Sequence, residues 1–155
     1  VDEKSLPNGN KYSDACKKKF PDENIIIVCA DIEDQIMGLQ ANDRKDFMLE
    51  SGIKSTGLDN LIKTGYNTLG LSTFFTSGPE ESRAWTIEKK SKAVDAAGVI
   101  HSDFKKKFIR AETVTHEDFV KYKGFNECKN AGKLRLEGKD YLVNDGDVMY
   151  FRTGN

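Results

Sequence analysis

The order of apolar runs and turns from residue 71 onward constrains the fold of this chain more than any other feature of its sequence. Leu71–Phe75 and Arg83–Ile87 are rich in β-branched and aromatic residues and flank a turn at Gly78, which predicts a β-hairpin. Ala93–Ile100 is helical, with small residues that allow close packing, and Phe108–Val114 alternates apolar and polar residues as a strand does. Two strands, a helix and then further strands predict a small α+β sheet domain of the β-grasp type, which clasps one helix.

The rest of this region adds one helix and one turn to the prediction. Thr115–Tyr122 opens with a pattern like a capping box, so we expect a helix there, with Thr115 or His116 at its start. Tyr141–Val143 and Val148–Phe151 flank the sequence Asn-Asp-Gly-Asp, a strong signal for a tight turn. We therefore expect a tight turn near residue 145 between two short strands.

The first seventy residues predict a different class of structure, an incomplete α/β domain. Asn24–Ala30 contains the unbroken apolar run IIIVCA, typical of a strand buried on both faces of a parallel sheet. Such a strand needs neighbours, and no other strand is predicted between residues 1 and 70. The chain also opens with Val1 and no initiator Met. We therefore expect residues 1–70 to be the end of a larger domain whose earlier part is missing.

Helices account for most of the remaining residues before position 70. The expected ranges, from spacing and capping residues, are Tyr12–Phe20, Asp31–Leu39 with Asp31 as N-cap, Asn42–Leu49 with Asn42 or Asp43 as N-cap, and Thr56–Leu69.

Composition places the chain among globular proteins. Charged residues make up 32% and hydrophobic residues 37%, and no apolar run approaches the roughly 20 residues of a membrane-spanning helix. The three cysteines include no CxxC pair and no Cys/His cluster with zinc spacing, so we expect no metal site. We also expect reduced thiols in a cytoplasmic protein. A monomer is a separate expectation. The net charge is −1, but residues 1–70 are net acidic and residues 71–155 net basic. The second part therefore permits a polyanionic partner.

Four blocks in order resemble the YchF-type Obg-like ATPases of the Obg/TRAFAC GTPase superfamily. They are FFTSGPEESRAWTI from Phe74, AAGVIHSDFKKKFIRAE from Ala96, AGKLRLEGKDYLV from Ala131 and DGDVMYF from Asp145. The resemblance implies that residues 1–70 are the C-terminal part of a Ras-like P-loop G domain and that residues 71–155 are a TGS domain, a β-grasp module. The chain departs from the family by having three lysines at residues 105–107, where a glycine is usual, and by lacking a glycine in residues 88–92.

The resemblance also implies a nucleotide-dependent function for the complete protein, which would bind ATP or GTP, hydrolyse ATP with Mg²⁺ and bind the ribosome. This chain lacks the P-loop pattern GxxxxGK[ST], whose backbone amides and lysine hold the phosphates. We therefore expect no catalytic residue in it and no activity from it alone.

What the chain would retain of the nucleotide site is the edge that reads the base, carried by Val1, Glu3, Cys29 and Ala30. Glu3 stands where GTPases have an aspartate that binds guanine; the longer side chain displaces the carboxylate and removes guanine selection. The alternative is that Glu3 is an ordinary solvated loop carboxylate.

A basic set is the second candidate site, for ribosome or ribosomal RNA, because lysine and arginine neutralise phosphate charge. Its members are Lys89, Lys90, Lys92, His101, Lys105, Lys106, Lys107 and Arg110. An exposed Phe104 or Phe108 ring would add stacking on a base. The alternative is that these are solvated lysines around core aromatics. His101 and Asp103 invite a general-base reading, which we do not favour because no nucleophile accompanies them. A stand-alone β-grasp module that binds RNA or protein without a nucleotide remains the alternative function.

Overall fold

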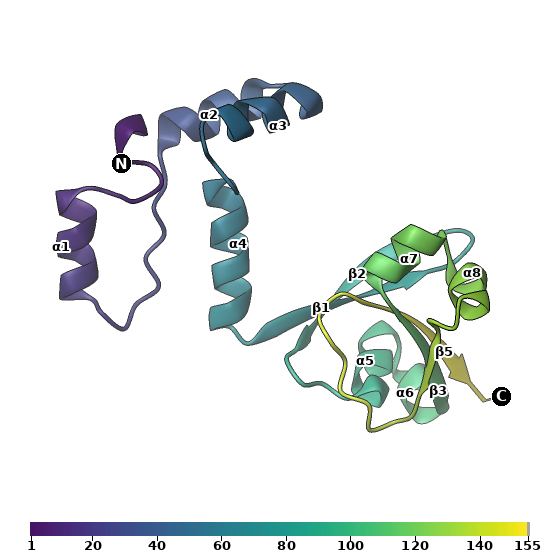
Figure 1. The fold of residues 1–155 in the computed structure, drawn as a ribbon. Coiled ribbons are helices and arrows are strands. Elements are labelled where there is room, and N and C mark those ends of the chain that lie inside the picture. Colours follow the sequence, from purple (N-terminus) through teal and green to yellow (C-terminus); the bar gives the residue numbers. More distant parts are fainter. Residues whose placement is uncertain (155) are drawn as a thin grey trace. The chain divides into compact units, whose positions relative to one another are not determined.

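The computed structural model describes residues 1–154, which form two compact units, Val1–Tyr66 and the residues from Asn67 onward (Figure 1). Each unit has a core of its own and is described by itself.

The first unit is helical. It contains the short 3-10 helix η1 (Glu3–Ser5) and the helices α1 (Lys11–Lys19), α2 (Ala30–Gly38), α3 (Ala41–Glu50) and most of α4 (Gly57–Thr68). Its small core is made by Cys29, Ile32 and Ile36, against which Leu6, Phe47, Met48 and Ile53 pack. The four predicted helices are confirmed to within two residues at each end.

The strand predicted at Asn24–Ala30 is wrong for the part of the chain that the structure describes. Residues 24–29 carry no strand pairing, and Ala30 already belongs to α2. A strand exists only by hydrogen bonding to a neighbour, and no other strand lies in Val1–Tyr66. Within the apolar run IIIVCA, residues 25–27 are half-buried, Cys29 is buried, and Val28 and Ala30 are exposed.

Two predicted helix caps are also wrong. Cys29 precedes α2 and Gln40 precedes α3, and neither side chain caps its helix. Asp31 and Asp43 lie instead in the first turns, where a negative charge interacts favourably with the helix dipole.

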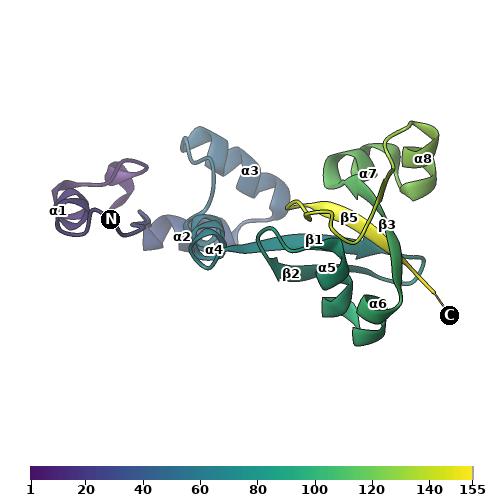
Figure 2. The same ribbon diagram turned by 90° about the horizontal axis from the view of Figure 1, so that it is seen from below.

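The second unit is a five-stranded mixed sheet with four helices (Figure 2). Its elements along the chain are β1 (Leu71–Ser77), β2 (Ser82–Glu88), α5 (Ala93–Ile100), α6 (Ser102–Lys106), β3 (Phe108–Thr115), α7 (His116–Tyr122), α8 (Phe125–Asn130), β4 (Arg135–Glu137) and β5 (Asp147–Thr153). The strand order is β2-β1-β5-β3-β4; β1 and β5 are parallel and the other neighbours are antiparallel. The predicted hairpin β1–β2, the helix α5 and the strand β3 are confirmed.

The sheet has α5 and α6 on one side and α7 and α8 on the other (Figures 1 and 2). On one face Phe74, Met149 and Phe151 pack with the small residues of α5 in the main core. On the other, Val114 and Val148 pack with Cys128 and the aromatic rings of α7 and α8 in a smaller core. Thr115 is the N-cap of α7, because its side chain accepts a hydrogen bond from the Asp118 amide at 3.1 Å, and His116 is the first helical residue.

The tight turn predicted around residue 145 is confirmed, but the strand expected before it at Tyr141–Val143 is wrong, because that segment makes only one isolated bridge. Leu142 pairs with Lys92 and not with β5. The turn is bound instead to β1: the Gly146 amide donates to the Thr73 carbonyl at 2.8 Å, and the Thr73 amide donates to the Asp145 carboxylate at 2.8 Å. Gly146 has a φ of +82°, a conformation that glycine adopts without strain. The turn therefore guides β5 into the middle of the sheet.

Candidate functional site

The four residues predicted to read a nucleotide base lie together at the start of α2. The backbone nitrogen of Val1 donates a 2.8 Å hydrogen bond to the Val28 carbonyl. This bond places the first residues of the chain beside Cys29 and Ala30. Glu3 lies nearby, where its Oε1 accepts a 3.1 Å hydrogen bond from Nε2 of Gln35 on α2.

This cluster offers backbone groups and one carboxylate. Cys29 is 1% exposed as a whole residue, and its carbonyl accepts a 3.1 Å hydrogen bond from the Glu33 amide. Ala30 is the first residue of α2, and first-turn amides of a helix have no intrahelical partner. Beside Glu3 lies a cavity of about 280 Å³, whose lining includes Ile32, Gln35 and Phe47. The lining of this cavity includes one carboxylate, one amide and apolar side chains, and no basic residue from positions 1–154 belongs to it.

The predicted basic set is divided by ion pairs within the second unit. Lys92 Nζ lies 2.7 Å from Asp140, and Lys105 Nζ lies 2.8 Å from Asp95. The hydrogen bond to Asp140 raises the pKa of Lys92. Lys106 lies 4.0 Å from Asp103, and Lys89 donates to the Asn67 side chain at 2.8 Å. The surface is therefore one of mixed charge around α5 and α6.

Four members of the basic set form no ion pair within residues 1–154, and three of them, unlike Lys89, also make no side-chain hydrogen bond. Lys90, Lys107 and Arg110 are exposed and form no ion pair within residues 1–154. Lys90 has a φ of +66°, in the left-handed region that favours glycine. A glycine would adopt this turn conformation without strain.

His101 is a capping residue and not half of a general-base pair. Its Nδ1 accepts a 3.1 Å hydrogen bond from the Asp103 amide and so caps α6. The predicted stacking by Phe104 or Phe108 is not supported, because Phe108 is 5% exposed and Phe104 packs on the main core. Within residues 1–154 no group of three or more His, Cys, Asp or Glu side chains is placed to hold a metal ion.

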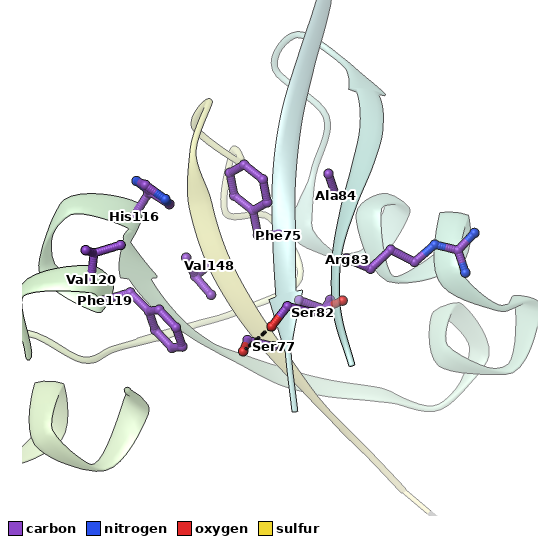
Figure 3. Close-up of a pocket in the computed structure, with 10 residues that line it drawn as sticks. Phe75, Ser77, Ser82, Arg83, Ala84, His116, Phe119, Val120 and Val148 are labelled. Carbon is purple, nitrogen blue, oxygen red and sulfur yellow. Dashed lines mark hydrogen bonds between the residues drawn. The ribbon is translucent and has the colours of Figure 1, made fainter. Parts of the chain in front are cut away.

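Sequence reasoning missed an apolar groove between the β1–β2 hairpin and α7 (Figure 3). It has a volume of about 430 Å³ and is floored by Phe75, Ala84 and Val148, with Phe119 and Val120 as its wall. The Ser77 and Ser82 hydroxyls, 2.8 Å apart, lie at one end, and the Arg83 side chain points away from it (Figure 3). The lining comes from four separate segments whose apolar residues read as core, so the sequence carries no signal for it.

Comparison with known proteins decides the family. Residues 71–154 match YchF-GTPase_C, described as a protein of unknown function (DUF933). This chain belongs to the YchF family. The "Ribosome-binding ATPase YchF" of Bacillus subtilis (strain 168) is 49% identical over 153 residues, covering 97% of this chain and 42% of that protein. The protein of the same name from Escherichia coli O157:H7 is 47% identical with the same coverage.

A solved structure agrees with these relatives. The YchF GTPase of Schizosaccharomyces pombe superposes with a TM-score of 0.79 at 35% identity, over 97% of this chain and 41% of that one. The chain thus spans about two fifths of the length of the YchF relatives it matches and corresponds to their C-terminal portion. The helices of residues 1–154 include none long and apolar enough to cross a membrane.

Proposed function

We propose that this chain is the C-terminal part of a cytoplasmic, monomeric ribosome-binding ATPase. In this proposal residues 1–70 complete a Ras-like nucleotide-binding G domain, and residues 71–155 form a TGS domain that contributes ribosome or ribosomal RNA binding. The observation that carries it is the 49% identity, over 97% of this chain, to a protein named a ribosome-binding ATPase. Because the aligned region includes the first seventy residues, it disfavours a stand-alone β-grasp module.

The surface of the first unit supports the missing-domain part of the proposal. Residues 25–29 have the composition of a buried strand but pair with no strand of residues 1–154. Leu58, Leu61 and Ile62 of α4 are 59%, 57% and 51% exposed. Amphipathic helices normally bury such a stripe against a sheet or another helix. Further strands of a G domain would cover both features.

The nucleotide part of the proposal assigns the base edge to Val1, Glu3, Cys29 and Ala30. ATP would place its adenine against these backbone groups. The Glu3 carboxylate would be held by Gln35 and so kept from the position in which an aspartate binds guanine. The phosphates and Mg²⁺ would be held by residues outside this chain, since it contains no P-loop. Hydrolysis is therefore an activity proposed only for the complete protein.

The ribosome part of the proposal assigns RNA contact to the basic set, with Lys90, Lys107 and Arg110 as its strongest members. Lys92 and Lys105 are already neutralised by carboxylates. An approaching phosphate would have to displace those acids, whereas the three unpaired side chains are free to release counterions on contact.

The test is sedimentation of the complete protein with ribosomes through a sucrose cushion, over a series of salt concentrations, with ATP, with ADP and without nucleotide. We expect binding that weakens steeply with salt and differs between the ATP and ADP samples, together with ATP hydrolysis by the protein alone. Binding that ignores both nucleotide and salt, with no hydrolysis, would refute the proposal and favour the stand-alone module.

A further inference from the structure

The half of the sheet that α7 and α8 leave uncovered carries an unusual pair of arginines. Arg110 on β3 and Arg152 on β5 are directly opposite each other in the antiparallel register. Directly opposed residues of an antiparallel pair point to the same face, and like charges in that position destabilise a sheet. An irregularity in the register between Phe108 and Arg110 brings the two residues into this alignment.

Only one of the two arginines has its charge compensated. Arg152 donates to both oxygens of Glu112, from Nε at 2.9 Å and from Nη2 at 3.3 Å. Its guanidinium also lies over the Tyr150 ring, 4.5 Å from the centroid. Arg110 is exposed and has no acidic partner within residues 1–154. Packing therefore explains Arg152, but it does not explain why an arginine stands at position 110.

The same face exposes apolar surface beside this charge. Tyr150 is 43% exposed although its ring touches Phe125 of α8, and Leu136, the cross-strand partner of Glu112, is 60% exposed. We call the surface made by Arg110, Leu136, Tyr150 and Arg152 the arginine face. It lies on the opposite side of the sheet from α5 and α6, and so from most of the basic set.

We propose that the arginine face binds single-stranded RNA, with one phosphate held by Arg110 beside the Arg152–Glu112 pair and one base stacked against Tyr150 and the guanidinium of Arg152. This inference rests on the proposed function and names the surface that makes the contact. Guanidinium groups bind phosphate oxygens in a bidentate manner, and a phosphate on Arg110 would supply the negative charge that Glu112 already supplies to Arg152. An exposed aromatic ring and a guanidinium plane on a sheet can stack on an unpaired base of a single strand. Bases within a duplex are stacked on one another and cannot make this contact.

The experiment measures anisotropy of a fluorescein-labelled ten-nucleotide oligouridine bound to the complete protein, across a salt series. Arg110→Thr removes the opposed charge and keeps β propensity. We expect its affinity to fall about tenfold, and the slope of log affinity against log salt to fall by about 0.7 for one lost phosphate contact. Its thermal midpoint should be unchanged or higher, since a repulsion is lost, which separates the loss of binding from unfolding.

Two further variants complete the test. Tyr150→Leu keeps an apolar side chain and removes the ring, so we expect about fivefold or greater weakening with an unchanged salt slope. Lys18→Ala, an exposed residue of α1 in the other unit, is the charge control and should bind as the original protein does.

The inference is overturned if Arg110→Thr keeps both affinity and slope, or if Tyr150→Leu has no effect. Equal competition by duplex RNA or by polyglutamate would overturn it too, the latter by identifying an acidic protein as the partner. Ribosome sedimentation is run in parallel with the same variants. If the unaltered protein sediments with ribosomes and Arg110→Thr does so equally well, the proposed function stands and the arginine face is refuted. If the unaltered protein neither sediments nor binds the oligonucleotide, both fall.

Discussion

The hydroxyl of Tyr141 donates a 2.7 Å hydrogen bond to Oδ2 of Asp147, a residue that is 2% exposed. The same carboxylate accepts the Asn144 amide at 3.0 Å and, on Oδ1, Nη2 of Arg135 at 3.0 Å. A buried carboxylate is tolerated only when its oxygens are satisfied in this way. The network fixes the loop before β5 to β4.

Removing the hydroxyl should weaken the sheet unit. Tyr141→Phe leaves one oxygen of a buried carboxylate with a single donor, at an expected cost of about 1.5–3 kcal/mol in the free energy of unfolding. Trp85 is the only tryptophan and lies in β2, so its fluorescence during urea unfolding reports on this unit. Tyr150→Phe, at a half-exposed hydroxyl, is the matched control and should stay within about 0.5 kcal/mol. Equal effects of both changes would contradict the assignment.

The same residue should give the sheet unit an alkaline limit. Burial, and then the hydrogen bond to Asp147, raise the pKa of Tyr141 above its ordinary value of about 10. A raised folded-state pKa means that the stabilisation is fully present below pH 10 and is lost as pH rises through the folded-state value. Stability measured between pH 9 and pH 11.5 should therefore fall more steeply for the original protein than for Tyr141→Phe. Parallel curves would rule this out.

Replacing each of two glycines of α4 by alanine should change the free energy of unfolding in opposite directions. A Cβ at Gly57 would lie 2.9 Å from Cγ2 of Val28 and 3.0 Å from Oε1 of Glu33, which also accepts the Gly57 amide. We expect Gly57→Ala to cost about 1–3 kcal/mol by overpacking. Gly65 has no atom within 4 Å of the added carbon, so Gly65→Ala should gain about 0.5–1 kcal/mol of helix propensity. Amide hydrogen exchange in α2 and α4 measures both, and a loss of protection in Gly65→Ala would be inconsistent with this packing.

Lys90 should be more stable as glycine. Its φ of +66° costs an L-residue about 1–2 kcal/mol of stability. Glycine removes this cost, but its more flexible unfolded chain offsets part of the gain. We expect Lys90→Gly to gain about 0.5–1 kcal/mol by Trp85 fluorescence. The control is Lys89→Gly, at the preceding residue, which has no positive φ. It should lower the free energy of unfolding, since Lys89 also donates to Asn67. A gain in both would indicate a general charge effect.

Glu3 should set nucleotide preference in the complete protein. Glu3→Asp shortens the side chain, withdraws it from Gln35 and restores the residue that GTPases use, so we expect affinity for GTP relative to ATP to rise about tenfold. Gln35→Ala tests the holding contact and should shift the ratio in the same direction by less. Titration with fluorescent ATP and GTP analogues gives both ratios, and an unchanged ratio in Glu3→Asp would remove Glu3 from the base site.

Local pattern was sufficient wherever an element's partners lie close in the sequence. The β1–β2 hairpin needed only the turn between its strands, and α5 needed only its own small residues and flanking loops. Pattern failed where the partner lies elsewhere. Residues 25–29 have strand composition but no neighbouring strand in the described chain, and Val148 pairs with Phe75, more than seventy residues earlier.

The candidate sites show the same division. Charge in the sequence located the lysines, but only coordinates show that Asp95 and Asp140 neutralise Lys105 and Lys92. Arg110 was found as part of a basic run, yet its opposition to Arg152 depends on a register irregularity that no spacing rule reveals. The groove beside Phe75 had no signal, since a core residue and a groove residue look alike in one dimension.

The central strand β5 is also the last strand of the sheet along the chain, and this has a consequence for biosynthesis. Until the ribosome has released residues through Thr153, β1 with β2 and β3 with β4 are two separate strand pairs, and each has an unpaired edge where β5 will bind. Unpaired margins of this kind recruit other chains during translation. A premature stop codon before Asp147 would therefore leave two strand pairs with unpaired edges that are prone to aggregate, and not a smaller folded domain.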